Sequence, residues 1–169
     1  MQLIVIRHAI AEEKEEFASQ GLPDTERPLT KRGRKIMKRV ASGLRREVRS
    51  IDVLAASPLV RAQQTARIVS KEYGDIAIET VSALEPERAP SALATWLRAQ
   101  SDAEVVAIVG HEPHLGIFVS WMIAGLETSQ VEIEKGGVCL LDIRGAPRAR
   151  AARLRWALTP GVLRKLSAR

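Results

Sequence analysis

The chain alternates between two hydrophobic patterns, which predict strands and helices in turn. Short apolar runs rich in β-branched residues are typical of strands buried on both faces, and they cover residues 3–6, 51–56, 76–81 and 104–109. The segments between them are interpreted as helices, over residues 30–49, over residues 59–73, from Pro90 and behind Pro113. In the first helix, apolar residues recur every four positions and form one buried face: Ile36, Val40, Leu44 and Val48.

The segment between the first strand and the first helix has a different character. Residues 9–30 hold Gly21, Pro23 and Pro28 among many charges, and they predict a long loop. Long loops inside compact domains are often functional.

The last third of the chain predicts an antiparallel hairpin. Residues 138–143 and 152–158 are interpreted as its two strands, with the turn near Gly145. In the second strand the apolar residues Leu154, Trp156 and Leu158 alternate with Arg153 and Arg155. This alternation predicts a strand with its apolar side chains in the core and its arginines in solvent.

Strands separated by helices indicate an α/β fold. We expect a three-layer α/β/α sandwich with a mostly parallel central sheet and a C-terminal antiparallel hairpin. A length of 169 residues favours a single domain over residues 1–169.

Composition and charge narrow the function classes. The single cysteine, Cys139, excludes an intrachain disulfide and a cysteine-rich zinc site. No segment has the pattern of an export signal or a membrane span, so we expect a cytoplasmic protein without membrane contact. Lys and Arg outnumber Asp and Glu by 26 to 20, and residues 144–169 hold eight basic residues and no acidic ones. The chain has only three Trp, one Tyr and two Phe. Because proteins that bind single-stranded nucleic acid stack its bases on aromatic side chains, this composition argues against a nucleic-acid partner.

Reactive side chains follow three of the predicted strands. Arg7 and His8 follow the first strand, Arg61 lies shortly after the second, and His111 comes after the strand that ends at Val109. Right-handed crossovers place the carboxyl ends of parallel strands at one edge, where ligands bind. Arginine binds phosphate oxygens in pairs, and imidazole serves as nucleophile, proton donor or phosphate ligand. The sequence therefore predicts a pocket for a phosphoryl dianion, without an acidic cluster for a metal ion.

Four motifs carry a family resemblance. They are Arg7-His8; Arg27-Pro28-Leu29-Thr30 with Gly33; Ser57-Pro58-Leu59-Val60-Arg61 with Thr65; and Gly110-His111-Glu112-Pro113. In this order the chain resembles the histidine phosphatase superfamily, which includes cofactor-dependent phosphoglycerate mutases. It is most similar to the short bacterial phosphohistidine phosphatases of signal transduction. The resemblance implies a phosphoglycerate mutase-like fold and no cofactor.

The resemblance also implies roles for single residues. His8 would be the nucleophile that is transiently phosphorylated, Arg7 and Arg61 would bind the phosphoryl oxygens, and His111 would complete the catalytic set. Arg27 and Thr30 are further substrate-binding candidates, although Thr30 is equally suited to cap the following helix.

The chain departs from the family at two points. Ala9 stands where the family usually has glycine, so an ordinary backbone is expected there. Glu85 is the nearest candidate for the general acid that larger members use on esters.

Three functions remain open at this point. The preferred one is a metal-independent phosphatase for phosphohistidine on a protein partner, such as a phosphotransfer domain. The second is a phosphatase for small phosphate esters with the same mechanism. The third is a non-catalytic module that binds phosphate or nucleic acid through its basic surface.

Overall fold

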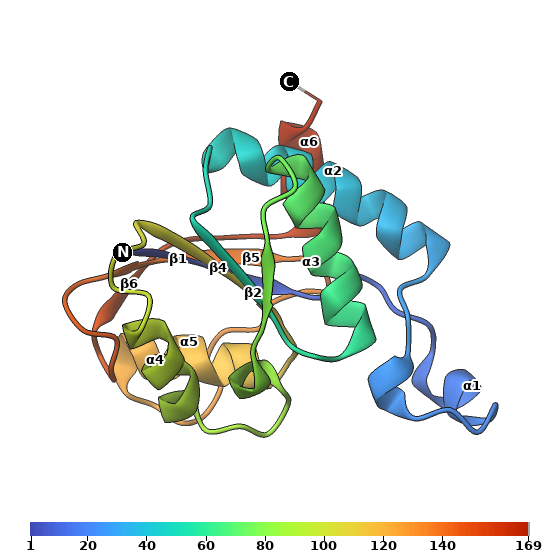
Figure 1. The fold of residues 1–169 in the computed structure, drawn as a ribbon, viewed down its shortest axis with the longest axis horizontal. Helices are drawn as coiled ribbons and strands as arrows, with labels where there is room; N and C mark the ends of the chain where they lie inside the picture. Colours follow the sequence, from blue (N-terminus) through green and yellow to red (C-terminus); the bar gives the residue numbers. More distant parts are fainter. Residues whose placement is uncertain (169) are drawn as a thin grey trace.

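The centre of the molecule is a six-stranded sheet in the order β3-β2-β4-β1-β5-β6 (Figure 1). The computed structural model describes residues 1–168. The strands are β1 (Gln2–Arg7), β2 (Val53–Ala56), β3 (Ile78–Thr80), β4 (Val105–Gly110), β5 (Val138–Ile143) and β6 (Ala152–Leu158). The first four in this order are parallel, whereas β5 runs antiparallel to β1 and β6 antiparallel to β5. The predicted mostly parallel sheet with a C-terminal antiparallel hairpin is confirmed.

Helices cover both faces of the sheet, because alternate residues of the central strands point to opposite sides. Ile4 and Ile6 of β1 join the core beneath three helices, which are α2 (Lys31–Glu47), α3 (Val60–Glu72) and α6 (Pro160–Leu166). Leu3 and Val5 join the core on the other face, beneath α4 (Pro90–Arg98) and α5 (His114–Ala124). Figure 1 shows the two helical layers on opposite sides of the strands. None of the helices within residues 1–168 has the length and apolar character needed to span a membrane.

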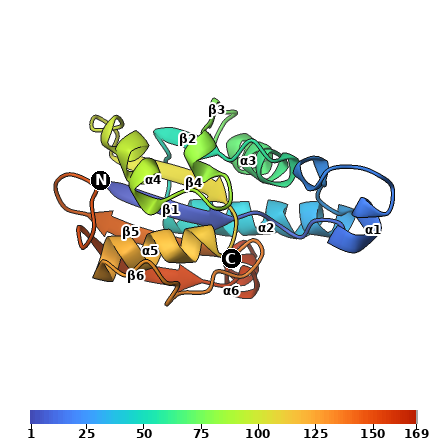
Figure 2. The ribbon, with the colours of Figure 1, turned by 90° about the horizontal axis from the view of Figure 1, so that it is seen from below.

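The segment between β1 and α2 has more structure than the predicted loop. It contains the short helix α1 (Lys14–Ala18), the 3₁₀ helix η1 (Asp24–Glu26) and a single bridge between Ala11 and Leu29. Phe17 is the buried residue of α1, so a single aromatic side chain anchors this turn. Figure 2 shows the segment projecting beyond the carboxyl end of β1. A five-residue helix leaves too short a periodic pattern to be found in the sequence.

The helix α6 was also not predicted. Thr159 caps its N-terminus by accepting a hydrogen bond from the Val162 N–H, and Pro160 occupies the first turn. A Thr-Pro pair is a start signal for a helix, so the signal was present in the sequence. Leu163 of α6 is fully buried, and its carbonyl lies against Gly43 of α2.

The alternation expected in β6 is wrong at Leu154, which is 42% exposed. The register shifts between Leu140 and Leu141: Leu154 pairs with Leu141, but Trp156 pairs with Leu140. Arg155 is therefore an extra residue in β6. A bulge of this kind moves the following side chains to the other face of the sheet. Trp156 accordingly packs on the α2 side, whereas Ala152 belongs to the core on the α5 side.

Candidate active site

Three neighbouring strands end at the same edge of the sheet and bring the predicted residues together. Arg7 at the end of β1 pairs in register with Gly110 at the end of β4. The His8 N–H donates to the Gly110 carbonyl at 3.0 Å, and the Ser57 N–H donates to the Val109 carbonyl at 3.0 Å. His8, Ser57 and His111 are consequently fixed by the sheet itself.

His8 is held in one tautomer by the backbone. Its Nδ1 lies 2.7 Å from the carbonyl oxygen of Ala9. A carbonyl only accepts, so Nδ1 carries the hydrogen and Nε2 keeps its lone pair. The imidazole is 6% exposed, and its ring centroid lies 5.2 Å from that of His111. Ala9 is not among the residues with positive φ, as expected for an alanine in place of glycine.

The surroundings keep both histidines uncharged in the free protein. Burial, together with the charges of Arg61, Arg7 and Arg27, lowers the pKa of His8 to about 4 against the opposing hydrogen bond to Ala9. Burial lowers the pKa of His111 to about 2, with help from His8 and Arg61. A neutral imidazole with a free Nε2 is the nucleophilic form.

Two guanidinium groups lie near the histidines, that of Arg61 buried and that of Arg7 partly buried. Arg61 in the first turn of α3 is 5% exposed, and burial lowers the pKa of its guanidinium from the ordinary value. Arg7 donates from Nη1 to the Ile133 carbonyl at 2.8 Å. The Nε atoms of both arginines are buried and have no hydrogen-bond partner within the described chain. An anion that accepted from them would satisfy donors that are otherwise costly to bury.

Asp24 is a residue of this site that sequence reasoning missed. Its Oδ2 lies 3.1 Å from Nη2 of Arg61, and its Oδ1 lies 2.7 Å from Nε of Arg27. Arg27 is thereby brought close to Arg61. The Arg27 hydrogen bond and the two arginine charges outweigh partial burial and lower the pKa of Asp24. The sequence signal that could have revealed this ion pair is the position of Asp24 directly after Pro23 and three residues before Arg27.

His111 shares a hydrogen bond with Ser57. Its Nε2 lies 2.8 Å from the Ser57 Oγ, while its Nδ1 is buried without a partner in residues 1–168. Ser57 is fully buried and also accepts from the Leu59 N–H at 3.4 Å. The serine therefore sets the orientation of His111 from the loop that follows β2.

Thr30 and Glu85 are placed differently from the other candidates. Thr30 Oγ1 accepts from the Gly33 N–H at 2.8 Å and donates to the Ile10 carbonyl at 3.3 Å, so it caps α2. Glu85 follows η2 (Ser82–Leu84) and pairs with Arg88, Oε1 to Nη2, at 3.5 Å. Within residues 1–168 Glu85 forms no ion pair with Arg7 or Arg61.

Thr65 and His114 are two more buried residues near the site. Thr65 Oγ1 accepts from the Ala9 N–H at 3.0 Å and donates to the Arg61 carbonyl at 2.8 Å. The threonine thus joins the backbone beside His8 to the helix that carries Arg61. His114, in the first turn of α5, is 3% exposed.

The arrangement is suited to accept a phosphoryl group. A neutral Nε2 can form a bond to phosphorus, and buried guanidinium groups can stabilise charge on the equatorial oxygens. Within residues 1–168, no three His, Cys, Asp or Glu side chains gather closely enough to hold a metal ion.

Comparison with known proteins gives two sequence matches. The sequence profile of the histidine phosphatase superfamily (branch 1) matches residues 3–86. An uncharacterized protein of Picosynechococcus sp. is 32% identical over 154 residues, which cover 89% of this chain and 90% of that protein. The profile match contains Arg7, His8 and Arg61, while the longer match extends over most of the chain.

Solved structures share the fold over nearly the whole length. The protein histidine phosphatase SixA, complexed with tungstate, matches with a TM-score of 0.83 at 21% identity over 96% of this chain and 99% of that chain. The α-ribazole phosphatase from Shigella flexneri matches with a TM-score of 0.72 at 18% identity over 95% of this chain and 97% of that chain. At these identities the likeness is one of fold.

Proposed function

The chain belongs to the histidine phosphatase superfamily, and on that basis we propose that it hydrolyses phosphohistidine on a protein partner through a covalent intermediate on His8. The observation that carries the proposal is the 2.7 Å hydrogen bond from His8 Nδ1 to the Ala9 carbonyl. It leaves Nε2 unprotonated in the field of the Arg7 and Arg61 guanidinium groups. Family membership and this site together support phosphatase activity.

The first step transfers the phosphoryl group to the protein. His8 Nε2 forms a bond to phosphorus as the P–N bond of the substrate breaks, and the leaving imidazole takes up a proton from solvent water. Arg7 and Arg61 stabilise the equatorial oxygens during transfer. The dianion also opposes the positive charges that lower the pKa of His111 in the free protein, so His111 becomes easier to protonate next to the phosphoryl group.

The second step regenerates the nucleophile. A water molecule attacks phosphorus, the P–Nε2 bond breaks, and inorganic phosphate leaves with the oxygen of that water. His8 returns to the neutral form with its hydrogen on Nδ1, because the Ala9 carbonyl still accepts from that atom. Division into two steps replaces one difficult displacement by two easier ones.

The choice of phosphohistidine over esters rests on the carboxyl groups near the site. An alkoxide leaving group needs a proton donor, whereas imidazole leaves readily. Asp24 reaches Arg61 but is kept ionised by its arginine partners, which lower its pKa. Glu85 is paired with Arg88. Burial raises the pKa of a third carboxyl, Glu112, but both of its oxygens accept hydrogen bonds from backbone N–H groups. The three carboxyl groups near the site are therefore engaged with arginines or with the backbone.

The proposed reaction needs no metal ion, since arginine charges take the place of a divalent cation at the phosphoryl oxygens. Activity should therefore persist in EDTA. Loss of turnover in EDTA, restored by Mg²⁺ or Zn²⁺, would contradict this part of the proposal.

Intact-mass spectrometry after brief exposure to phosphoramidate tests the intermediate. Wild type should gain the mass of one phosphoryl group in an acid-labile form, and His8→Ala should gain none. Turnover without a trapped adduct means that hydrolysis outruns phosphorylation, and rapid quenching then recovers the adduct. Absence of both adduct and released phosphate would refute the enzyme and leave phosphate binding as the function.

The substrate class is tested with phosphohistidine and phosphoserine, which share a phosphoryl group and differ in the leaving atom. We expect kcat/KM to be higher for phosphohistidine by about 100-fold or more, a difference of roughly 3 kcal/mol in the barrier. A preference for phosphoserine that is lost in Glu85→Gln would identify Glu85 as a general acid and the protein as an ester phosphatase.

A further inference from the structure

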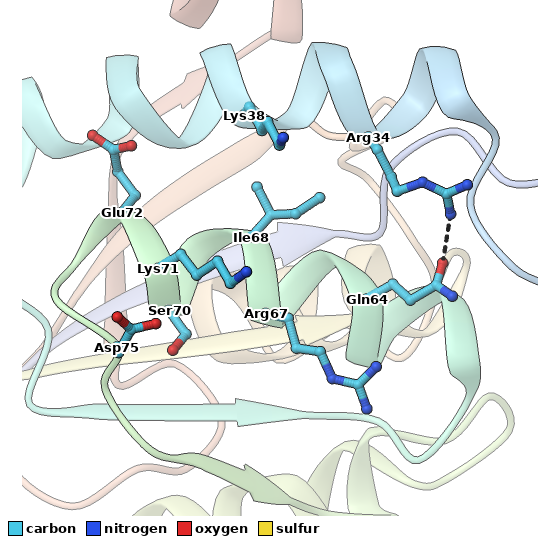
Figure 3. A pocket seen from close by; sticks show the side chains of 9 residues that line it. All are labelled: Arg34, Lys38, Gln64, Arg67, Ile68, Ser70, Lys71, Glu72 and Asp75. Carbon is cyan, nitrogen blue, oxygen red and sulfur yellow. Dashed lines mark hydrogen bonds between the residues drawn. The ribbon is translucent and has the colours of Figure 1, made fainter.

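A groove between α2 and α3 lies outside the candidate active site. It has a volume of about 640 Å³, and its walls come from both helices. Figure 3 shows Lys38 on α2 and Lys71 on α3 on either side of Ile68, with Arg34 on α2 reaching Gln64 and Arg67 on α3 extending away from α2.

The four basic side chains have no acidic partner. None of them forms an ion pair within residues 1–168, where the ion pairs involve Asp24 and Glu85 alone as acids. Each helix places its two cations four residues apart, a spacing at which like charges destabilise a helix. Both pairs line the same groove. This self-repulsion is relieved when an anion binds between them.

The groove adjoins the candidate active site through Gln64. The Gln64 Oε1 accepts from the Leu29 N–H at 2.8 Å and from Arg34 Nη1 at 3.3 Å. Leu29 follows Arg27 by two residues, and Gln64 lies one helical turn after Arg61. The basic side chains line the groove from the end at Gln64, and Glu72 and Asp75 lie at the other end (Figure 3). A ligand in the basic part would extend toward His8.

The occupant is expected to be an acidic face of a protein. In an α-helix, residues four apart are separated by about 6 Å along the axis, so carboxylates at this spacing on a partner helix match both pairs of cations. The residues that line the groove include no aromatic side chain, so it offers no platform for stacking nucleic-acid bases. Ile68 is half-buried in the floor and would contact the aliphatic part of glutamate side chains.

We propose that the α2–α3 groove docks an acidic helical face of the phosphoprotein substrate and so presents its phosphohistidine to His8. This inference rests on the proposed function for the identity of the partner. Docking lowers KM for an acidic substrate without altering the chemistry at His8, because the groove residues do not contact the reacting groups.

The test uses two synthetic peptides phosphorylated by phosphoramidate. Each carries one histidine, a Gly-Ser linker and an alanine-rich helix, with Glu at successive i, i+4 positions in one and Gln in the other. In wild type we expect kcat/KM for the Glu peptide to exceed that for the Gln peptide by about tenfold, a difference of roughly 1.4 kcal/mol. The preference should shrink to less than twofold in Lys38→Ser/Lys71→Ser.

The matched control is Arg153→Ser/Arg155→Ser, which removes the same charge from exposed positions of β6. It should keep the preference for the Glu peptide. Turnover of phosphoramidate itself should be equal in wild type and both variants. If wild type fails to turn over phosphoramidate, the proposed function is wrong. Fluorescence anisotropy of the unphosphorylated peptides then still shows whether the groove binds the Glu peptide.

Two results would overturn the docking proposal. One is an equal loss of preference in both variants, which would mean that overall charge and not the groove selects the Glu peptide. The other is an unchanged preference in Lys38→Ser/Lys71→Ser. If a single-stranded DNA oligonucleotide binds wild type and loses affinity only in the groove variant while the peptide preference is unchanged, the occupant is nucleic acid.

Discussion

The hydroxyl of Thr65 supports the backbone next to His8 from a neighbouring helix. It accepts from the Ala9 N–H at 3.0 Å, and the carbonyl of the same residue accepts from His8 Nδ1 at 2.7 Å. Thr65 is fully buried, so no water replaces a lost hydroxyl. The orientation of the imidazole therefore depends on one side chain that never needs to contact the substrate.

Thr65→Val tests this positioning role. The substitution keeps the shape but leaves the Ala9 N–H without its partner, which costs about 1–3 kcal/mol of stability. We expect kcat with phosphoramidate to fall by roughly 10- to 100-fold, because small displacements of a nucleophile are costly, while the affinity for inorganic phosphate stays within about twofold. Thr65→Ser keeps the hydroxyl and should recover most of the rate. A Thr65→Ser variant as slow as Thr65→Val would show that packing of the methyl group is what matters.

Burial of neutral histidines makes stability depend on pH. The pKa of His8 is lowered to about 4, whereas in the unfolded chain it has the ordinary value of 6.5. Between these values the unfolded state binds more protons, so the free energy of unfolding falls as pH falls. The contribution of His8 is on the order of 3 kcal/mol, lost between about pH 6.5 and pH 4.

Urea unfolding followed by circular dichroism at pH 7 and pH 4.5 measures this loss. His8→Gln should unfold with a smaller difference between the two pH values than wild type, because glutamine does not titrate. An equal difference in the two proteins would place the origin of acid sensitivity elsewhere. Above pH 7 both histidines are neutral in either state, and no pH dependence from them is expected there.

The position of the candidate catalytic residues at one edge of the sheet could be predicted because they follow strands. Arg7, His8 and His111 lie at or directly after strand ends, and Arg61 is in the first turn of the next helix. Asp24 and the positioning role of Thr65 escaped prediction for a physical reason. Their roles depend on contacts across 37 and 56 positions in sequence, and a short polar side chain leaves no periodic pattern that reveals such partners.

At the level of elements, α2 is fixed by two close backbone contacts. A Cβ on Gly33 would lie 2.1 Å from the Ile10 carbonyl oxygen, and one on Gly43 would lie 1.9 Å from the Leu163 carbonyl oxygen. The first contact seats the helix against the segment that follows His8. The second seats it against α6, at the other end of the helix.

Gly33→Ala and Gly43→Ala form a matched pair of variants. Each should lower the free energy of unfolding by about 1–3 kcal/mol through overpacking, partly offset by about 1 kcal/mol of helix propensity. Only Gly33→Ala displaces Ile10, two residues from His8, so only it should lower kcat/KM, by about tenfold. Thermal unfolding and phosphoramidate turnover at a temperature where both remain folded make the comparison. Equal loss of activity in both would mean that the helix moves as a rigid unit.

Two helices were missed because they are short, and the bulge in β6 was missed because the sequence of that strand alternates regularly. The helix α1 has five residues and a single buried side chain, while α6 has seven and directly follows a strand. In β6 the alternation of Leu and Arg predicted one apolar face, but a single extra residue reversed the face halfway along. A bulge is decided by pairing with β5, which local sequence does not encode.

For the whole molecule, the mostly parallel sheet followed from the order of strands and helices, and the order β3-β2-β4-β1-β5-β6 became visible only in the structure. This order places the ends of β2, β4 and β1 side by side. At this edge Asp24 forms ion pairs with both Arg27 and Arg61. On a chain of net charge +6, that acid occupies guanidinium groups that a phosphoryl anion would use.

Competition between Asp24 and bound phosphate leads to a prediction about the molecule as a whole. Asp24→Asn removes the competing charge and leaves an amide of the same shape, so inorganic phosphate should inhibit turnover at roughly three- to tenfold lower concentration, a change of about 1 kcal/mol. Glu26→Gln in the same turn removes an equal charge that forms no ion pair in residues 1–168, and it should shift inhibition by less than twofold. Similar shifts in both variants would mean that phosphate responds to the net charge of the molecule. Weaker inhibition in Asp24→Asn alone would mean that Asp24 chiefly orients Arg27 and Arg61 for the anion, and that the ion pairs assist binding instead of opposing it.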